Sequence, residues 1–256
     1  MKREQIYIDE RRNKILELIK EYKEISVNEL SNILDVSLMT IRRDLQFLHD
    51  RNLIKRIYGG ALFIETEKTK KEELLYYRTL IAKFAAKFVE HKDTLFINTS
   101  GNSLMMTKYI TKNNVTVITN NGKAITSAHG RGVSIILTGG ELRYPKESMV
   151  GDFAIKNLQT IFAKKAFIGC SGISETAGIT TKIANEVNIN ELMIKNATNG
   201  VYVLADHTKI GKISSFTTSD IENITHLITD EKAPKEILEK LEKKGVIIHQ
   251  VKRGFF

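Results

Sequence analysis

The chain has 256 residues, of which 42% are hydrophobic and 27% charged. This composition is typical of folded globular proteins and excludes a largely disordered chain. Lys and Arg outnumber Asp and Glu by 39 to 30, so the formal net charge is +9. Excess positive charge favours a polyanionic partner but does not show where that partner binds.

The cysteine and histidine content limits the redox and metal chemistry of the chain. Cys170 is the single cysteine, which excludes an intramolecular disulfide and a multi-cysteine zinc site. The six histidines show no metal-ligand spacing, and we expect no metal site. The N-terminal residues are charged, and no run approaches the ~20 apolar residues of a transmembrane helix. We therefore expect a cytoplasmic protein without membrane association.

The first 62 residues predict three helices. Residues 8–22 place apolar side chains at the spacing of one helical face. Ser26 and Glu29 have the spacing of a capping box at the start of a second helix. Ser37 is a suitable N-cap for a third helix, about three residues after the second ends. Two short helices joined by so tight a turn indicate a helix-turn-helix.

The residues after the third helix predict a wing. Residues 53–62 are typical of two short strands, or of a strand and a turn, around Gly59 and Gly60. This addition predicts a winged helix-turn-helix domain over residues 1–62. Residues 63–73, which are polar and charged from Glu65 onward, are the expected linker to a second domain over residues 74–256.

The third helix is expected to present a polar face to DNA. Arg43 and Gln46 are the leading base readers, because Arg pairs with guanine and Gln with adenine in the major groove; Met39 and Thr40 lie close by. Phosphate contacts, which position a protein without reading sequence, are expected from Ser37, Arg42, Lys55, Arg56 and Tyr58. A merely solvated helix face is the alternative, which the tight turn and the Gly-Gly wing disfavour.

Local charge supports the same surface. Residues 37–58 hold five basic and two acidic residues, a net charge of +3, whereas residues 1–36 hold seven and eight, a net charge of −1. Positive charge is therefore concentrated on the third helix and the wing, where a phosphate backbone would lie.

The remainder of the chain predicts an α/β fold. Short apolar runs alternate with helical stretches at 152–162, 184–196 and 234–244. The apolar runs are 94–97, 115–118, 133–137, 166–168, 201–204, 225–228 and 246–249. Strands without a polar face indicate a mostly parallel sheet covered on both sides. Such sheets bind ligands outside the carboxyl ends of their strands.

The segments Val-Ser-Leu-Met-Thr-Ile-Arg-Arg-Asp-Leu at 36–45 and Leu-Ile-Lys-Arg-Ile-Tyr-Gly-Gly-Ala at 53–61 closely resemble the signature of the DeoR family of bacterial sugar-metabolism repressors. The resemblance covers nearly the whole chain. It implies a winged helix-turn-helix joined to an effector-sensing and oligomerisation domain with a fold resembling ribose-phosphate isomerase. It also implies binding of double-stranded operator DNA as a homodimer or homotetramer, with a phosphorylated sugar as effector and no further cofactor.

Strand-end loops rich in Gly, Ser, Thr and Asn match the ligand loops of that family. The expected effector-binding residues are Thr99, Ser100, Gly101, Asn102, Ser103, Asn120, Gly139, Gly140, Gly169, Glu186, Asp206 and Lys209. Lys209 is expected to pair with a phosphate and Asp206 to accept from sugar hydroxyls. For any one loop taken singly, an ordinary turn between strand and helix is the alternative.

The chain departs from the family pattern at four positions. The family commonly has acidic residues where this chain has Thr99 and Lys164, and basic residues where it has Asn190 and Glu191. These changes remove an acceptor for a sugar hydroxyl and positive charge for a phosphate. They imply an unusual effector or weakened sensing.

We therefore expect a sequence-specific DNA-binding repressor of a sugar-metabolism operon and not an enzyme. One alternative is an isomerase or deaminase acting on sugar phosphates. Such an enzyme needs a poised acid or base in the crevice. Because this chain has Thr99 in the first loop, only Asp206 and Glu186 remain for that role. Another is a regulator with a degenerate sensor, which answers to a protein partner or to no effector. Cys170 is interpreted as a small buried hydrophobe and His207 as a loop residue rather than a base.

Overall fold

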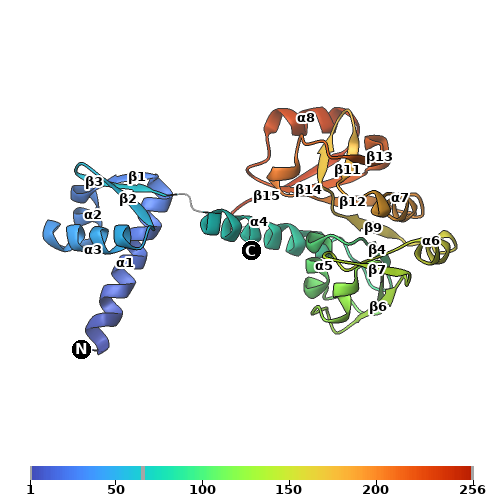
Figure 1. Cartoon of the computed structure of the whole chain (residues 1–256), viewed down its shortest axis with the longest axis horizontal. Helices are drawn as coiled ribbons and strands as arrows, with labels where there is room; N and C mark the ends of the chain where they lie inside the picture. Colours follow the sequence, from blue (N-terminus) through green and yellow to red (C-terminus); the bar gives the residue numbers. More distant parts are fainter. Residues whose placement is uncertain (1, 65–66, 255–256) are drawn as a thin grey trace. The chain divides into compact units, whose positions relative to one another are not determined.

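The computed structural model describes residues 2–64 and 67–254. The chain separates into two compact units, Met1–Glu73 and Leu74–Phe256. The first is a winged helix-turn-helix and the second an α/β unit built on a parallel sheet (Figure 1). The predicted fold class is therefore confirmed.

The described residues of the N-terminal unit hold three complete helices and a small antiparallel sheet with strand order β1-β3-β2. Its elements are α1 (Lys2–Tyr22), β1 (Glu24–Ser26), α2 (Val27–Leu34), α3 (Leu38–Asp50), β2 (Ile54–Ile57) and β3 (Gly60–Phe63). The three predicted helices are present, and the segment around Gly59 and Gly60 forms two strands. The sequence did not predict β1, whose three residues are too few to show a periodicity.

Local hydrogen bonds fix the turn between α2 and α3. The predicted capping box is present, since the Glu29 amide donates to Ser26 Oγ (3.1 Å) and the Ser26 amide donates to Glu29 Oε2 (2.8 Å). Asp35 adopts the left-handed conformation and ends α2. Ser37 Oγ accepts from the Thr40 amide (3.2 Å) and starts α3.

Buried ion pairs join α1 to α3. The α3 side chains Ile41, Leu45 and Leu48 are buried in the apolar core of the unit, as predicted. Asp44 is also buried, and its carboxylate accepts from Nε of Arg11 (2.7 Å) and Nε of Arg12 (2.8 Å). The sequence did not reveal this contact, because nothing in a single sequence pairs residues more than 30 positions apart.

The C-terminal unit is built on a seven-stranded parallel sheet with the order β15-β14-β12-β9-β4-β5-β6. The strands are β4 (Thr94–Ile97), β5 (Val115–Thr119), β6 (Val133–Leu137), β9 (Lys165–Ile168), β12 (Val201–Leu204), β14 (His226–Asp230) and β15 (Ile247–Val251). These are the seven strands that the sequence predicts. Adjacent strands in this sheet pair in parallel.

The order of these strands creates a switch point in the middle of the sheet. From β4 the chain moves outward through β5 and β6, and then returns to β9 on the other side of β4. From β9 it moves outward again through β12, β14 and β15. The connections after β4 and β9 therefore leave in opposite directions, which opens a crevice at the carboxyl ends of these two strands.

Helices cover both faces of the sheet. Leu95 and Ile97 of β4 pack in a cluster with α4, whereas Phe96 belongs to the cluster that includes α6, α7 and α8. These helices are α4 (Glu67–Ala86), α6 (Asp152–Gln159), α7 (Val187–Lys195) and α8 (Lys235–Lys243). A sheet buried on both sides explains why its strands lack a polar face. No helix in the described part of the chain is long and apolar enough to cross a membrane.

Smaller elements surround the crevice. A hairpin of β7 (Glu141–Arg143) and β8 (Ser148–Val150) follows β6, and an antiparallel sheet has the order β10-β11-β13. Its strands are β10 (Gly172–Ser174), β11 (Gly178–Thr181) and β13 (Phe216–Ser219), and the short helix α5 (Gly101–Met106) follows β4. The sequence did not predict these strands.

The segment 63–73, predicted as a linker, is largely helical. Strand β3 reaches Phe63 and α4 begins at Glu67, while residues 65 and 66 lie outside the described residues. Glu and Lys favour helix, and ion pairs at helical spacing join Lys70 to Glu67 and Lys68 to Glu72. The division between the two units falls within α4, after Glu73.

A close backbone contact at the wing predicts a strong dependence on Gly60. A Cβ at this residue would lie 2.4 Å from the carbonyl oxygen of Ile25, so Gly60→Ala is expected to destabilise the N-terminal unit by about 1–3 kcal/mol. Thermal unfolding measures the loss, and hydrogen exchange of the wing amides localises it. Gly59→Asn is the control, because φ at Gly59 is +78° with open space around it and Asn tolerates that conformation. Equal losses for the two variants would contradict the steric argument.

Candidate functional site

The predicted DNA-contact residues form one exposed surface of α3 and the wing. All nine are at the surface, eight of them exposed and Thr40 half-buried. They are Ser37, Met39, Thr40, Arg42, Arg43 and Gln46 on α3 and its cap, and Lys55, Arg56 and Tyr58 on the wing. Tyr58 is fully exposed between β2 and β3. These side chains are free of the core and available to a groove.

One predicted base reader is held by its neighbours. Gln46 Oε1 accepts from Nη1 of Arg56 (2.7 Å), and Gln46 Nε2 donates to Oδ1 of Asp50 (2.6 Å). The amide of Gln46 thereby joins α3 to β2 of the wing. A base that pairs with both ends of this amide must replace both contacts.

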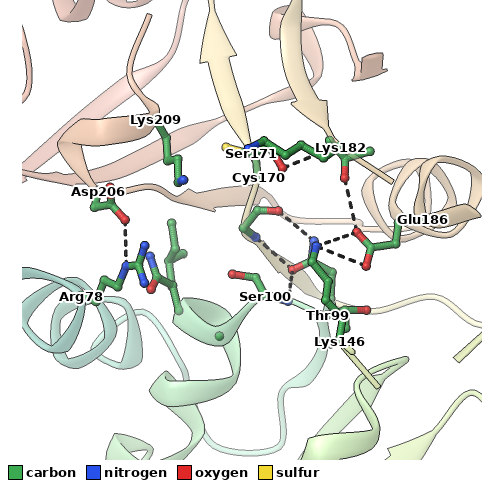
Figure 2. Close-up of a pocket in the computed structure, with 16 residues that line it drawn as sticks. Arg78, Thr99, Ser100, Lys146, Cys170, Ser171, Lys182, Glu186, Asp206 and Lys209 are labelled. Carbon is green, nitrogen blue, oxygen red and sulfur yellow. Dashed lines mark hydrogen bonds and ion pairs between the residues drawn. The ribbon is translucent and has the colours of Figure 1, made fainter. Parts of the chain in front are cut away.

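A pocket of about 250 Å³ lies at the carboxyl ends of β4, β9 and β12 (Figure 2). Its lining combines strand-end loops with residues of α4, of the segment between β7 and β8, and of the segment between β11 and α7. The lining residues are Arg78, Asn98, Thr99, Ser100, Gly101, Asn102, Lys146, Gly169, Cys170, Ser171, Thr181, Lys182, Glu186, Leu204, Asp206 and Lys209. The pocket therefore occupies the switch point of the sheet.

The buried amide of Asn98 holds the first loop in place. Its Oδ1 accepts from the amides of Gly169 (3.0 Å) and Ser100 (3.3 Å). Its Nδ2 donates to the carbonyl of Gly169 (2.9 Å) and to Oδ1 of Asn190 (3.2 Å). Four hydrogen bonds saturate this amide and join the end of β4 to the end of β9 and to α7.

Gly169 permits the close approach of the two loops. A Cβ at this position would lie 1.9 Å from Ser100 Oγ and 2.3 Å from Ser100 Cβ. Only glycine leaves room for Ser100 to cover the end of β9.

The charged residues of the pocket form two groups (Figure 2). Arg78 Nε donates to Asp206 Oδ2 (2.9 Å) on one side, where Lys209 also lies. On the other side Lys146 Nζ donates to Glu186 Oε2 (3.2 Å). With Lys182, four basic residues meet two acidic ones in the lining. Within the described part of the chain, the ammonium groups of Lys182 and Lys209 have no hydrogen-bond or ion-pair partner. The site therefore has positive charge to offer an anion.

Asp206 is ionised at neutral pH. Burial alone would raise the pKa of its carboxyl group, but hydrogen bonds from Thr208 and Arg78 and the nearby charges of Arg78 and Lys209 outweigh burial and lower the pKa. The carboxylate can therefore only accept hydrogen bonds.

Thr99 brings an unsatisfied polar atom to the pocket. Its side chain is buried, and its Oγ1 has no hydrogen-bond partner among the described residues. Buried polar atoms are normally paired, so this hydroxyl is available to a bound molecule.

Comparisons with known proteins identify both units. Residues 11–67 match the model of the DeoR-like helix-turn-helix domain, and residues 76–231 match that of the DeoR C terminal sensor domain. The chain is 34% identical to the HTH-type transcriptional regulator GolR of Listeria innocua, over 93% of this chain and 96% of that protein. The chain belongs to the DeoR family. It is a DNA-binding transcriptional regulator and not an enzyme.

Two further similarities concern a repressor and a fold. The chain is 29% identical to the lactose phosphotransferase system repressor of Staphylococcus aureus, over 86% of this chain and 91% of that protein. A ribose 5-phosphate isomerase of Methanocaldococcus jannaschii superposes with a TM-score of 0.38 at 17% identity, over 54% of each chain.

The structure brings eight of the twelve effector residues expected from the DeoR resemblance into the pocket, and places four elsewhere. Ser103 is fully buried in α5, and the Asn120 amide donates to the carbonyl of Met149 (3.3 Å). Gly139 and Gly140 form a turn with positive φ before β7, where a Cβ at Gly140 would meet a backbone oxygen of β8 at 2.5 Å. These four residues do not line the pocket.

Several lining residues were not predicted. Arg78 and Lys146 come from a helix and a hairpin, outside the strand-end loops, and no sequence signal places them here. Asn98 directly follows a predicted strand, and Cys170 and Ser171 lie two and three residues after another, so their positions at strand ends indicate a ligand site. The other residues missed are Thr181, Lys182 and Leu204.

Three of the four departures from the DeoR pattern lie outside the pocket. Lys164 precedes β9, at the amino end of the sheet, and its Nζ pairs with Asp93 (2.9 Å). Glu191 is exposed on α7, and Oδ1 of Asn190 accepts a hydrogen bond from Nδ2 of Asn98. Thr99 alone lines the site. Lys164 and Glu191 therefore give no reason to expect weakened sensing.

Two residues with reactive side chains have other roles. Cys170 lines the pocket and packs against the core, and burial raises the pKa of its thiol to about 12. It stays protonated near neutral pH. His207 Nδ1 lies 2.9 Å from Asp230 Oδ1 and is not a lining residue. Among the described residues, no group of three or more His, Cys, Asp or Glu could hold a metal ion.

The Asn98 network predicts that Asn190 matters for stability. Asn190→Ala removes an acceptor and leaves a buried N–H of Asn98 unpaired, which is expected to cost about 1–3 kcal/mol in the free energy of unfolding. Asn188→Ala is the matched control, because Asn188 is exposed on the same helix and should change stability by no more than ~0.5 kcal/mol. Urea unfolding of both variants measures the difference. Indistinguishable unfolding midpoints would show that the network does not stabilise the unit.

Proposed function

We propose that this chain represses transcription from an operator and is controlled by a phosphorylated sugar bound at the switch point of its C-terminal unit. The observation that carries the proposal is the pocket itself, which combines an ionised, buried carboxylate with ammonium groups that have no partner among the described residues. A phosphate requires cations, and sugar hydroxyls require acceptors. The family match and the repressors among the relatives support the same role.

DNA is bound through α3 and the wing. In this proposal the amino-terminal part of α3 enters the major groove, where Arg43 and Gln46 contact base edges. The wing residues Lys55, Arg56 and Tyr58 contact phosphates. The protein acts as a homodimer or homotetramer on a symmetric operator, because repeated half-sites need repeated domains. Operator and regulator share one compartment, taken to be the cytoplasm.

The charged side chains of the pocket determine how the effector is oriented in this proposal. Lys209 and Lys182 face the phosphate, while Asp206 accepts from a sugar hydroxyl. Thr99 replaces the acid that is common in the family, and its hydroxyl both donates and accepts. A neutral group at this position recognises a hydroxyl without repelling a nearby phosphate.

Substitutions on α3 and the wing separate base reading from phosphate contact. Arg43→Ala is expected to weaken operator binding by about 1–3 kcal/mol and to weaken binding to a random duplex much less. Lys55→Ala should weaken both alike and reduce the slope of log K against log salt by about 1. Fluorescence anisotropy at several salt concentrations, on DNA from upstream of the gene and on a scrambled duplex, measures both effects. If the two variants lose the same affinity on both duplexes, the assignment of the groove is wrong.

A thermal-shift screen tests the sensor. A sugar phosphate present at 100 times its Kd stabilises a protein by about 2.7 kcal/mol, and we expect at least one hexose or pentose phosphate to stabilise the wild type in this way. Lys209→Ala should abolish the shift, whereas Lys212→Ala, an exposed lysine outside the lining, should retain it. If both variants retain the thermal shift, Lys209 does not belong to the site. No shift with any sugar phosphate would overturn the proposed effector class.

A further inference from the structure

Helix α4 contributes an arginine to the pocket. Arg78 Nε donates to Asp206 Oδ2 at 2.9 Å, and the two side chains are 35% and 1% exposed. The terminal nitrogens of Arg78 donate to no other residue in the described part of the chain. Arg78 therefore presents free guanidinium donors to the cavity that it lines. A guanidinium can bind a phosphate through two parallel hydrogen bonds.

The preceding residue, Tyr77, connects the same turn of α4 to the loop that follows β14. Tyr77 Oη donates to Glu231 Oε1 (3.0 Å), and its ring lies edge-to-face with that of His207 at 5.9 Å. His207 in turn contacts Asp230 (2.9 Å). Two consecutive residues thus attach α4 to the loops that follow β12 and β14.

The same helix follows the DNA-binding unit in the chain. The division between the two units falls between Glu73 and Leu74, inside α4, and α4 is the first helix or strand described after β3 of the wing. Arg78 lies about one turn after this division. A change in the contacts of Arg78 therefore acts on the helix that follows the DNA-binding unit in the chain.

The ion pair is suited to exchange with a ligand. Asp206 is buried and also accepts from Thr208, but losing its arginine without a replacement donor is costly for a buried carboxylate. A sugar phosphate supplies both a new acceptor for Arg78 and a new donor for Asp206. Its phosphate oxygens accept from Arg78, and its hydroxyls donate to Asp206. The position of Arg78 on α4 then depends on occupancy of the pocket.

We infer that Arg78 binds the anionic group of the effector and, by exchanging Asp206 for it, couples the pocket to DNA binding through α4. This inference rests on the proposed function. It separates two roles within one site, in which Lys209 contributes affinity and Arg78 contributes affinity and coupling. Coupling is the ratio of the DNA Kd values measured with saturating effector and without effector, typically about 5–150-fold.

The test compares variants of the full chain at saturating ligand. The probe is whichever of glucose 6-phosphate, fructose 1-phosphate, tagatose 6-phosphate and ribose 5-phosphate stabilises the wild type, with inorganic phosphate as reference. Calorimetry gives the ligand affinity, and anisotropy with the upstream duplex gives the coupling ratio. The variants are Arg78→Gln, Arg78→Lys and Lys209→Gln. The control is Lys71→Gln, which removes an exposed charge from the same helix. Thermal unfolding without ligand verifies that each variant is folded.

We expect both Arg78 variants to bring the coupling ratio to within about twofold of one at saturation. Arg78→Lys keeps the charge and therefore binds ligand well enough for the ratio to be measured, even where Arg78→Gln does not. Lys209→Gln should weaken ligand binding by tenfold or more and keep the wild-type ratio once saturated. Lys71→Gln should match the wild type in both quantities.

A wild-type coupling ratio in Arg78→Lys would overturn the inference and leave the proposed function intact. Loss of coupling in Lys209→Gln as well would also overturn it, because coupling would then not be specific to α4. A wild type whose stability and DNA affinity respond to none of the sugar phosphates would overturn the proposed function, and the inference with it.

Discussion

The reversal of strand order between β4 and β9 is the constraint on which the sensor depends. Because the chain moves outward on both sides of this point, the two connections diverge and leave a crevice above adjacent strand ends. Residues distant in sequence, such as Ser100, Gly169 and Asp206, meet there. The crevice is made a defined site by Asn98, whose saturated amide fixes both loops to each other. The topology of the sheet determines where the pocket lies, and the buried amide of Asn98 fixes the shape of its loops.

Each unit also contains a buried carboxylate held by arginine, and the difference between the two is informative. Asp44 is paired with both Arg11 and Arg12, whose side chains are only 16% and 18% exposed. Asp206 has one arginine, Arg78, which is 35% exposed and lines a cavity. A buried carboxylate with two shielded partners is a permanent structural contact. A buried carboxylate whose charged partner borders solvent makes an ion pair that a ligand can replace.

The sequence predicts those features that depend on neighbours along the chain. Ser26, Glu29 and Ser37 cap their helices through residues three positions away, so their spacing alone identifies them. The seven apolar runs predict the seven parallel strands, because a strand buried on both faces is apolar along its whole length. Arg78 and Lys146 reach the pocket only through tertiary packing, and no local pattern marks them. The segment 67–73 was predicted as a linker from its polarity, but polar residues with Glu–Lys pairs at helical spacing also form exposed helix.

The two acids of the pocket differ from Thr99 in their freedom to recognise a ligand. Glu186 accepts from Lys146 and Thr181, and Asp206 accepts from Arg78 and Thr208. Any new hydrogen bond to either carboxylate must share or displace a partner that is already present. Thr99 Oγ1 has no partner in the described structure, so a hydroxyl or phosphate oxygen meeting it displaces no protein contact. Under the proposed function, discrimination among similar sugars depends most directly on residue 99, where the family commonly has an acidic residue.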